Sequence, residues 1–166
     1  MKNKIIIADA SPLIALGKVN QLTLLEKLFN KVIIPQEVAD ECLFDRSRPG
    51  AIAIDSAIKQ GFITVETTPK TPLYSQLSNL LDKGEAAAIV HAMEINSLLL
   101  IDEKLGRNKA KQLGLKIVGT AGLLLIAKQK KIIKKVQPIV MALKQNGYRL
   151  SDELIKEILK KAQEIK

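Results

Sequence analysis

Acidic side chains stand where the chain leaves two of its most apolar runs. Asp9 directly follows the run Ile5–Ala8, and Asp102 directly follows the run Leu98–Ile101. In an open parallel sheet, ligands bind outside the carboxyl ends of the strands, near the point where the strand order reverses. If the two runs are neighbouring strands, as doubly wound topologies allow, the two carboxylates meet at one edge of the sheet.

Two further acids, Glu41 and Glu85, lie in the early turns of helices that we expect to begin at the same edge. Carboxylates brought together near a protein surface repel each other by roughly 1–4 kcal/mol per pair. A fold accepts this cost readily where a divalent cation binds, and ligation by oxygen alone suits Mg²⁺ or Mn²⁺. Such ions generate hydroxide and stabilise the charge that builds on a phosphate during in-line attack.

Other chemistries fit the residues less well. His91 is the only histidine and lies among alanines in an expected helix, which favours a packing or surface role. Cys42, the only cysteine, is expected to be a small buried apolar residue, so a disulfide within the chain or a zinc site built from cysteines is excluded. A phosphatase of the haloacid-dehalogenase type would use Asp9 as nucleophile. That chemistry goes with the motif Asp-x-Asp, and here Ser11 occupies the position of the second Asp.

The elements that must position these acids follow an alternating pattern. Short β-branched runs alternate with helical stretches, which predicts a parallel α/β sheet covered on both faces. The expected strands are Lys4–Ala8, Lys31–Ile34, Phe62–Val65, Leu98–Ile101 and Lys116–Val118. Ser11-Pro12 predicts an N-cap and a first helical turn, and Pro35 opens another helix. A length of 166 residues without repeat or linker suits one domain, 1–166.

The net charge of +9 is distributed unevenly. Residues 104–151 contain twelve Lys and Arg and no acid, whereas the rest of the chain has 14 basic and 17 acidic residues. This asymmetry indicates a polyanionic ligand that the basic region binds and on which the acidic region acts. The alternative is a lysine-rich surface that only increases solubility. Because the chain has three Phe, two Tyr and no Trp, we expect phosphate contacts to dominate and base stacking to be minor.

Four segments resemble the motifs of the PIN-domain ribonucleases, a family that includes the VapC-type toxins of bacterial and archaeal toxin–antitoxin pairs. They are Ile6–Ile14, Ile34–Glu41, Gly84–Ile89 and Leu99–Arg107, and their order and spacing hold over roughly residues 4–120. The resemblance implies a three-layer α/β sandwich with a central parallel sheet of about five strands flanked by helices. It also implies metal-dependent RNA cleavage with Mg²⁺ or Mn²⁺, and it alone selects Glu41 over its neighbours Glu37 and Asp40, which are then interpreted as solvated surface.

The chain departs from this pattern in three ways. Glu85 replaces an Asp that many members carry, and Glu103 stands where a close subgroup often has a second Asp. A helical C-terminal extension, about 121–166, runs beyond the length of the compact toxins. These departures indicate a longer PIN subgroup and weaken the toxin assignment more than the nuclease assignment.

Several roles remain open from the residues alone. Asp82 and Glu85 have the spacing of a capping box, so Glu85 is either a metal-site acid or only a helix cap. The expected nucleic-acid-binding residues are Ser11, Arg107, Lys109 and Lys111, although Ser11 is equally well explained as an N-cap.

RNA is the expected substrate. A small antitoxin protein is a possible partner, and a homodimer is a possible assembly. No apolar run is long enough to cross a membrane, and the single cysteine fits a cytoplasmic location. The alternative to an enzyme is a catalytically silent PIN-like module that binds RNA or a protein partner.

Overall fold

A computed structural model describes residues 4–166, and its centre is a five-stranded sheet in which every strand pairing is parallel. The strands are β1 (Ile5–Ala8), β2 (Lys31–Pro35), β3 (Ile63–Glu66), β4 (Leu98–Leu100) and β5 (Ile117–Val118). All five runs expected to be strands are strands, and each end lies within one residue of the expected position. The alternation of β-branched runs with helical stretches therefore predicted the sheet correctly.

The strand order across the sheet is β3-β2-β1-β4-β5, so it reverses between β1 and β4. The chain first builds outward from β1 through β2 to β3, and then crosses to the other side of β1 to form β4 and β5. Ile7 of β1 pairs with Ile33 of β2 and with Leu99 of β4. The carboxyl ends of β1 and β4 are thus the place where a sheet of this kind binds ligands.

Ten helices connect and flank the strands in the part of the chain that the structure describes. They are α1 (Ala10–Lys18), α2 (Thr23–Leu28), α3 (Gln36–Cys42), α4 (Pro49–Lys59), α5 (Pro72–Ser78), α6 (Lys83–Ile95), α7 (Lys104–Gln112), α8 (Thr120–Gln129), α9 (Gln137–Gln145) and α10 (Asp152–Lys161). Among residues 4–166, none of these helices has the length and hydropathy that a membrane-spanning segment needs.

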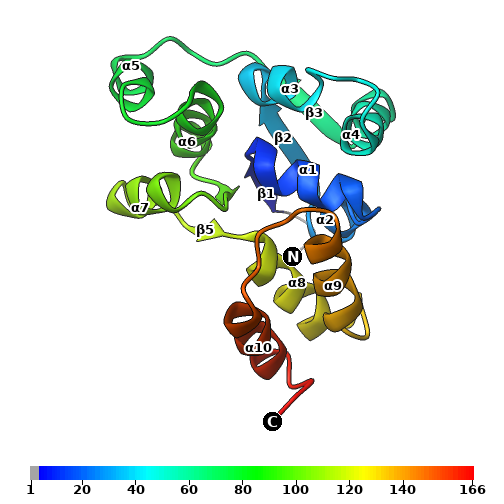
Figure 1. The fold of residues 1–166 in the computed structure, drawn as a ribbon. Helices are drawn as coiled ribbons and strands as arrows, with labels where there is room; N and C mark the ends of the chain where they lie inside the picture. Colours follow the sequence, from blue (N-terminus) through cyan, green and yellow to red (C-terminus); the bar gives the residue numbers. More distant parts are fainter. Residues whose placement is uncertain (1–3) are drawn as a thin grey trace.

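The central strand buries both of its faces, which explains its continuous apolar run. Ile6 and Ala8 belong to the core that includes α1, α2, α8, α9 and α10, whereas Ile7 belongs to the core that includes α5, α6 and α7. Figure 1 shows the green helices α5, α6 and α7 on one side of the sheet and α1 and α2 on the other, with α8, α9 and α10 forming the C-terminal part. The fold is the three-layer α/β sandwich that the sequence predicts.

Candidate acidic active site

Asp9 lies at the reversal of strand order, between the end of β1 and the start of α1. Its backbone N–H donates to the Leu100 carbonyl oxygen at 2.9 Å, which joins it to the end of β4. The residue is only 4% exposed. The expectation that Ser11 caps α1 is wrong, because the turn from strand to helix takes one residue and α1 begins at Ala10. Asp9 holds the N-cap position, yet within residues 4–166 its side chain makes no capping hydrogen bond.

Glu85 caps a helix and also faces the acidic site. Its backbone N–H donates to Asp82 Oδ1 at 2.8 Å, and its Oε1 accepts from the Asp82 N–H at 3.3 Å, which completes the capping box of α6. The other oxygen, Oε2, lies 3.5 Å from the place that a Cβ on Gly106 of α7 would occupy. Glu85 is 7% exposed. Because the cap uses one carboxylate oxygen, the other remains free for a second role.

Glu41 reaches the same region from α3. It lies in the last turn of that helix and not in an early turn as expected, because α3 ends at Cys42 after about two turns. Its Oε1 lies 3.4 Å from the place that a Cβ on Gly84 of α6 would occupy. Asp40 stays on the surface as expected, where it accepts from Gln36 Nε2 at 2.8 Å, and Cys42 is buried as expected.

Asp102 is held by Thr120, the first residue of α8. The Thr120 N–H donates to Asp102 Oδ1 and the Thr120 hydroxyl donates to Oδ2, both at 2.7 Å. Arg107 Nη1 donates to the Ile101 carbonyl oxygen at 2.8 Å. A Cβ on Gly119 would lie 2.9 Å from Asp102 Oδ1 and 2.9 Å from Arg107 Nη1, so the absence of a side chain there makes room for both groups. These contacts fix the orientation of the Asp102 carboxylate and leave further lone pairs on its oxygens.

Four carboxylates interact electrostatically in this region, and two of them, Asp9 and Glu85, are buried whereas Glu41 and Asp82 are exposed. Burial raises the pKa of Asp9 to about 8, although a hydrogen bond from the Ala10 N–H works against it. The charges of Glu85, Asp82 and Glu41 raise the pKa of Asp9 further. Burial and the charge of Asp82 also raise the pKa of Glu85 to about 7 and raise the pKa of Glu41. Asp9, Glu41, Asp82 and Glu85 therefore form one electrostatically coupled group, called here the acidic cluster.

The acidic cluster has a donor set that fits a divalent cation. Its donors are all carboxylate oxygens, which Mg²⁺ and Mn²⁺ prefer. In the described part of the chain, no Lys or Arg forms a salt bridge with any of the four carboxylates. Residues 4–166 also contain no three Asp, Glu, His or Cys side chains already gathered as ligands around one point. Since like charges repel, a cation would have to draw these carboxylates together.

Tyr148 approaches Asp102 from the C-terminal extension. The residue follows α9, and its hydroxyl lies near the side chains of Asp102 and Thr120. Burial, together with the charge of Asp102, holds the pKa of Tyr148 above its usual value. The phenol therefore stays protonated beside the carboxylate.

Sequence reasoning did not assign Asp82, Thr120 or Tyr148 to the site. Asp82 was treated only as a cap, although a capping carboxylate also carries charge. Thr120 had a usable signal, because it follows a strand by two residues as Asp102 does. Tyr148 had none, since 46 residues separate it from Asp102 and only the folded chain brings them together.

The basic residues of α7 that we expected to contact RNA lie on different sides of the helix. Arg107 and Lys111 are four residues apart and share a face with Lys104. Lys109 is rotated by about 200° from Arg107 around the helix, so it lies on the opposite side. Ser11 is exposed in the first turn of α1. The structure thus brings Ser11 and Arg107 to the edge where the acids lie, and it separates Lys109 from them.

Glu37 is not the solvated surface residue that the sequence suggested. It accepts from the Thr68 hydroxyl at 2.6 Å and from the Tyr74 hydroxyl at 2.9 Å. The Thr68 oxygen also lies 3.1 Å from His91 Nε2, and because the hydroxyl proton goes to Glu37, His91 is the donor in that pair. Burial opposes the shift, yet the hydrogen bonds from Thr68 and Tyr74 hold the pKa of Glu37 below its usual value. The network joins α3 to α5 and α6, the elements that carry Glu41 and Glu85.

Fold and site together describe an α/β sandwich with an acidic centre at its strand reversal. The chain belongs to the PIN-domain family, because a family model described as a PIN domain matches residues 5–164. PIN domains are generally nucleases, so the chain has a nuclease-type fold. A comparison with curated proteins finds no match.

Two solved structures are similar to this chain. One is a PilT N-terminus domain protein from the hyperthermophilic archaeon Sulfolobus solfataricus, with 23% sequence identity and a TM-score of 0.42 over 72% of this chain and 89% of that chain. The other is a domain of a functionally unknown protein from Methanocaldococcus jannaschii, with 24% identity and a TM-score of 0.45 over 70% of this chain and 90% of that chain.

Proposed function

We propose that this PIN domain hydrolyses phosphodiester bonds in RNA, with Mg²⁺ or Mn²⁺ bound between the acidic cluster and Asp102. The observation that carries the proposal is the acidic cluster itself, with Asp9 buried at the strand reversal and its pKa raised to about 8. Evenly matched ion pairs would stabilise a fold better than uncompensated carboxylates, so a cation is the natural partner of this arrangement. Perturbed acids gathered at the ligand-binding edge of a sheet are typical of a functional site.

Different residues of the chain would bind the cation and the phosphate. Asp9 and Asp102 would be the main ligands, and Glu41 and Glu85 would complete the shell directly or through water. A divalent cation held there supplies positive charge to the scissile phosphate and makes a water molecule more acidic. Arg107 uses one N–H on the Ile101 carbonyl oxygen, and its remaining donors are suited to a phosphate.

Cleavage of a short, fluorescently labelled single-stranded RNA tests the proposal directly. We expect cleavage in the presence of Mn²⁺ or Mg²⁺, complete loss of cleavage with EDTA, and recovery when Mn²⁺ is added in excess. RNA binding without cleavage under any metal condition would instead identify the catalytically silent module. An antitoxin partner and a homodimer stay predictions, and co-purification and light scattering test them separately.

The salt dependence of RNA binding tests the basic face of α7. Each phosphate contact on a single strand contributes about 0.7 to the slope of log affinity against log salt. In EDTA, a double substitution of Lys104 and Lys111 by Ala should therefore lower this slope by about 1.4. The same change at Lys156 and Lys160 in α10, where acids are interspersed, should leave it unaltered. Equal effects of both double variants would mean that the lysines act only as a general coat.

A further inference from the structure

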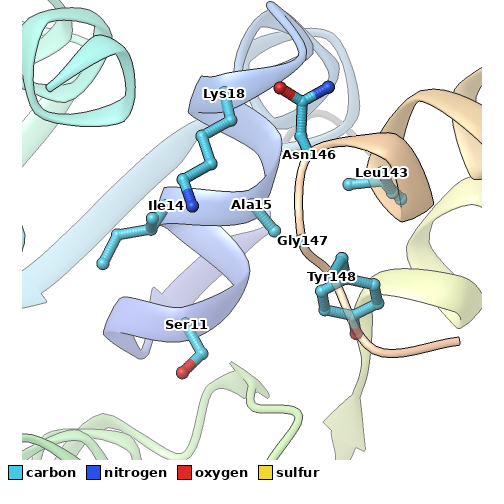
Figure 2. A pocket seen from close by; sticks show the side chains of 8 residues that line it. All are labelled: Ser11, Ile14, Ala15, Lys18, Leu143, Asn146, Gly147 and Tyr148. Carbon is cyan, nitrogen blue, oxygen red and sulfur yellow. The ribbon is translucent and has the colours of Figure 1, made fainter.

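A hollow lies between α1 and the segment that follows α9, on the side of the molecule where Asp102 is held. Ser11 and Lys18 line it from α1, and Asn146 and Tyr148 line it from the C-terminal extension. Figure 2 shows the Tyr148 ring and the Asn146 side chain on the C-terminal segment beside α1, with Ser11 near one end of that stretch of α1 and the Lys18 side chain lying along the helix with its nitrogen near Ile14. The hollow is therefore built by two segments that lie far apart in the sequence.

The hollow adjoins the acidic site at two points. Ser11 is two residues beyond Asp9 in the sequence, in the first turn of α1. Tyr148 forms a wall of the hollow and also reaches Asp102 with its hydroxyl. Gly147, with a φ of +90°, turns the chain so that Tyr148 runs back toward α1, a conformation that other residues rarely adopt. A ligand in the hollow would therefore lie on the side of the acidic site where Asp102 is held.

The chemistry of the lining matches a nucleotide. Lys18 is exposed and forms no salt bridge within residues 4–166, so its ammonium group is available to a phosphate. The Asn146 amide nitrogen donates to the Ala142 carbonyl oxygen at 2.8 Å, which leaves the amide oxygen as an acceptor for a base N–H. Tyr148 is half-buried and offers an aromatic face for stacking. A volume of about 190 Å³ is smaller than the roughly 300–1,000 Å³ of sites that enclose a whole small ligand, which suits one unit of a longer chain.

We propose that this hollow is the subsite for the nucleotide next to the scissile phosphate of a single-stranded RNA. Its base stacks on the ring of Tyr148 and its outer phosphate pairs with Lys18. Tyr148 is at the same time a positioning residue for Asp102. This assignment deepens the proposed function and rests on it for the identity of the substrate, whereas one wall of the hollow belongs to the C-terminal extension beyond residue 120.

Tyrosine fluorescence gives a direct readout of the stacking. The chain has no Trp and two Tyr, and Tyr74 is buried, so Tyr148 is the tyrosine that RNA can reach. In EDTA, addition of a short single-stranded RNA should quench the fluorescence of the wild-type protein. The quenching should disappear in Tyr148→Phe, although this variant should bind the RNA within about twofold because the ring remains. Quenching that persists in Tyr148→Phe would overturn the stacking.

Two further variants separate stacking, charge and positioning. Tyr148→Leu should weaken RNA binding roughly 5- to 150-fold, the loss expected for one stacked base. Lys18→Met should lower the salt slope of binding by about 0.7, whereas Lys27→Met in α2 should not change it. Tyr148→Phe should lower kcat about tenfold with little change in KM, because Asp102 loses a polar neighbour while the binding surface is retained. Melting temperatures of all variants report on the fold, and Lys18→Met and Tyr148→Phe test the subsite even if Tyr148→Leu does not fold.

The outcomes distinguish this proposal from the proposed function. If the protein cleaves RNA and every variant binds and quenches like the wild type, the subsite is wrong and the nuclease stands. If the protein binds RNA with the expected losses but never cleaves it, the subsite stands and the nuclease is wrong. If RNA neither binds nor quenches, both are wrong, and the hollow takes some other ligand.

Discussion

Substitution of either Asp9 or Asp102 by Asn is expected to abolish RNA cleavage while the fold survives. Asn keeps the size and most hydrogen bonds of Asp but removes an anionic ligand. Loss of a residue that only supports a metal ligand costs about 10- to 100-fold, so loss of a ligand itself should lower kcat/KM by more than about 100-fold. Asp40→Asn is the matched control, because Asp40 is exposed and its side chain accepts a hydrogen bond from Gln36 on the surface. Wild-type rates from either variant, at saturating Mn²⁺, would remove that residue from the site.

The Asp9 variant also makes a prediction about stability and pH. Because burial raises the pKa of Asp9 to about 8 in the folded protein, the folded state holds this proton more tightly than the unfolded state. The unfolded chain ionises first as the pH rises, so the wild-type protein loses stability between about pH 4 and pH 8. In EDTA, Asp9→Asn should therefore be more stable than the wild type at pH 8, and the difference should vanish at pH 4. Urea unfolding at both pH values measures this.

Glu85→Gln should cut activity at least tenfold without lowering the melting temperature. Gln also serves at the third position of a capping box, so the bond between its side-chain oxygen and the Asp82 N–H can persist. What the substitution removes is the charge on Oε2, the oxygen that the cap does not use. Kinetics with limiting and saturating Mn²⁺, together with thermal unfolding, separate the two effects.

The control for this prediction lies on the same helix. Glu94→Gln in α6 changes an exposed Glu far from the capping box and should alter neither quantity. If Glu85→Gln retained activity within about twofold of the wild type, the role of Glu85 would be confined to the helix cap. A large fall in melting temperature with normal activity would lead to the same conclusion.

Local patterns in the sequence were sufficient for the elements and for part of the site. The five strands were predictable because a central parallel strand needs apolar residues on both faces, as Ile6 and Ile7 show by packing into opposite cores. The capping box of Asp82 and Glu85 was predictable because a cap depends on residues only three positions apart. Asp9 and Asp102 could be nominated because each directly follows an apolar run expected to be a strand, and the strand reversal between β1 and β4 then brings the ends of those strands together.

Only the tertiary structure decided how the acids are arranged and what surrounds them. Glu37 and Glu41 lie on one short helix, yet contacts with Thr68 and Tyr74 from later elements bind Glu37 into a hydrogen-bond network, while Glu41 reaches α6. The spacing of residues along α3 could not distinguish them. The pKa of Asp9 depends on burial by the whole fold and on charges from two helices, and no local pattern carries that information. Tyr148 is the clearest case, because its approach to Asp102 depends on how α9 packs against α1 and on the turn at Gly147. Residues distant in sequence meet only when the core closes.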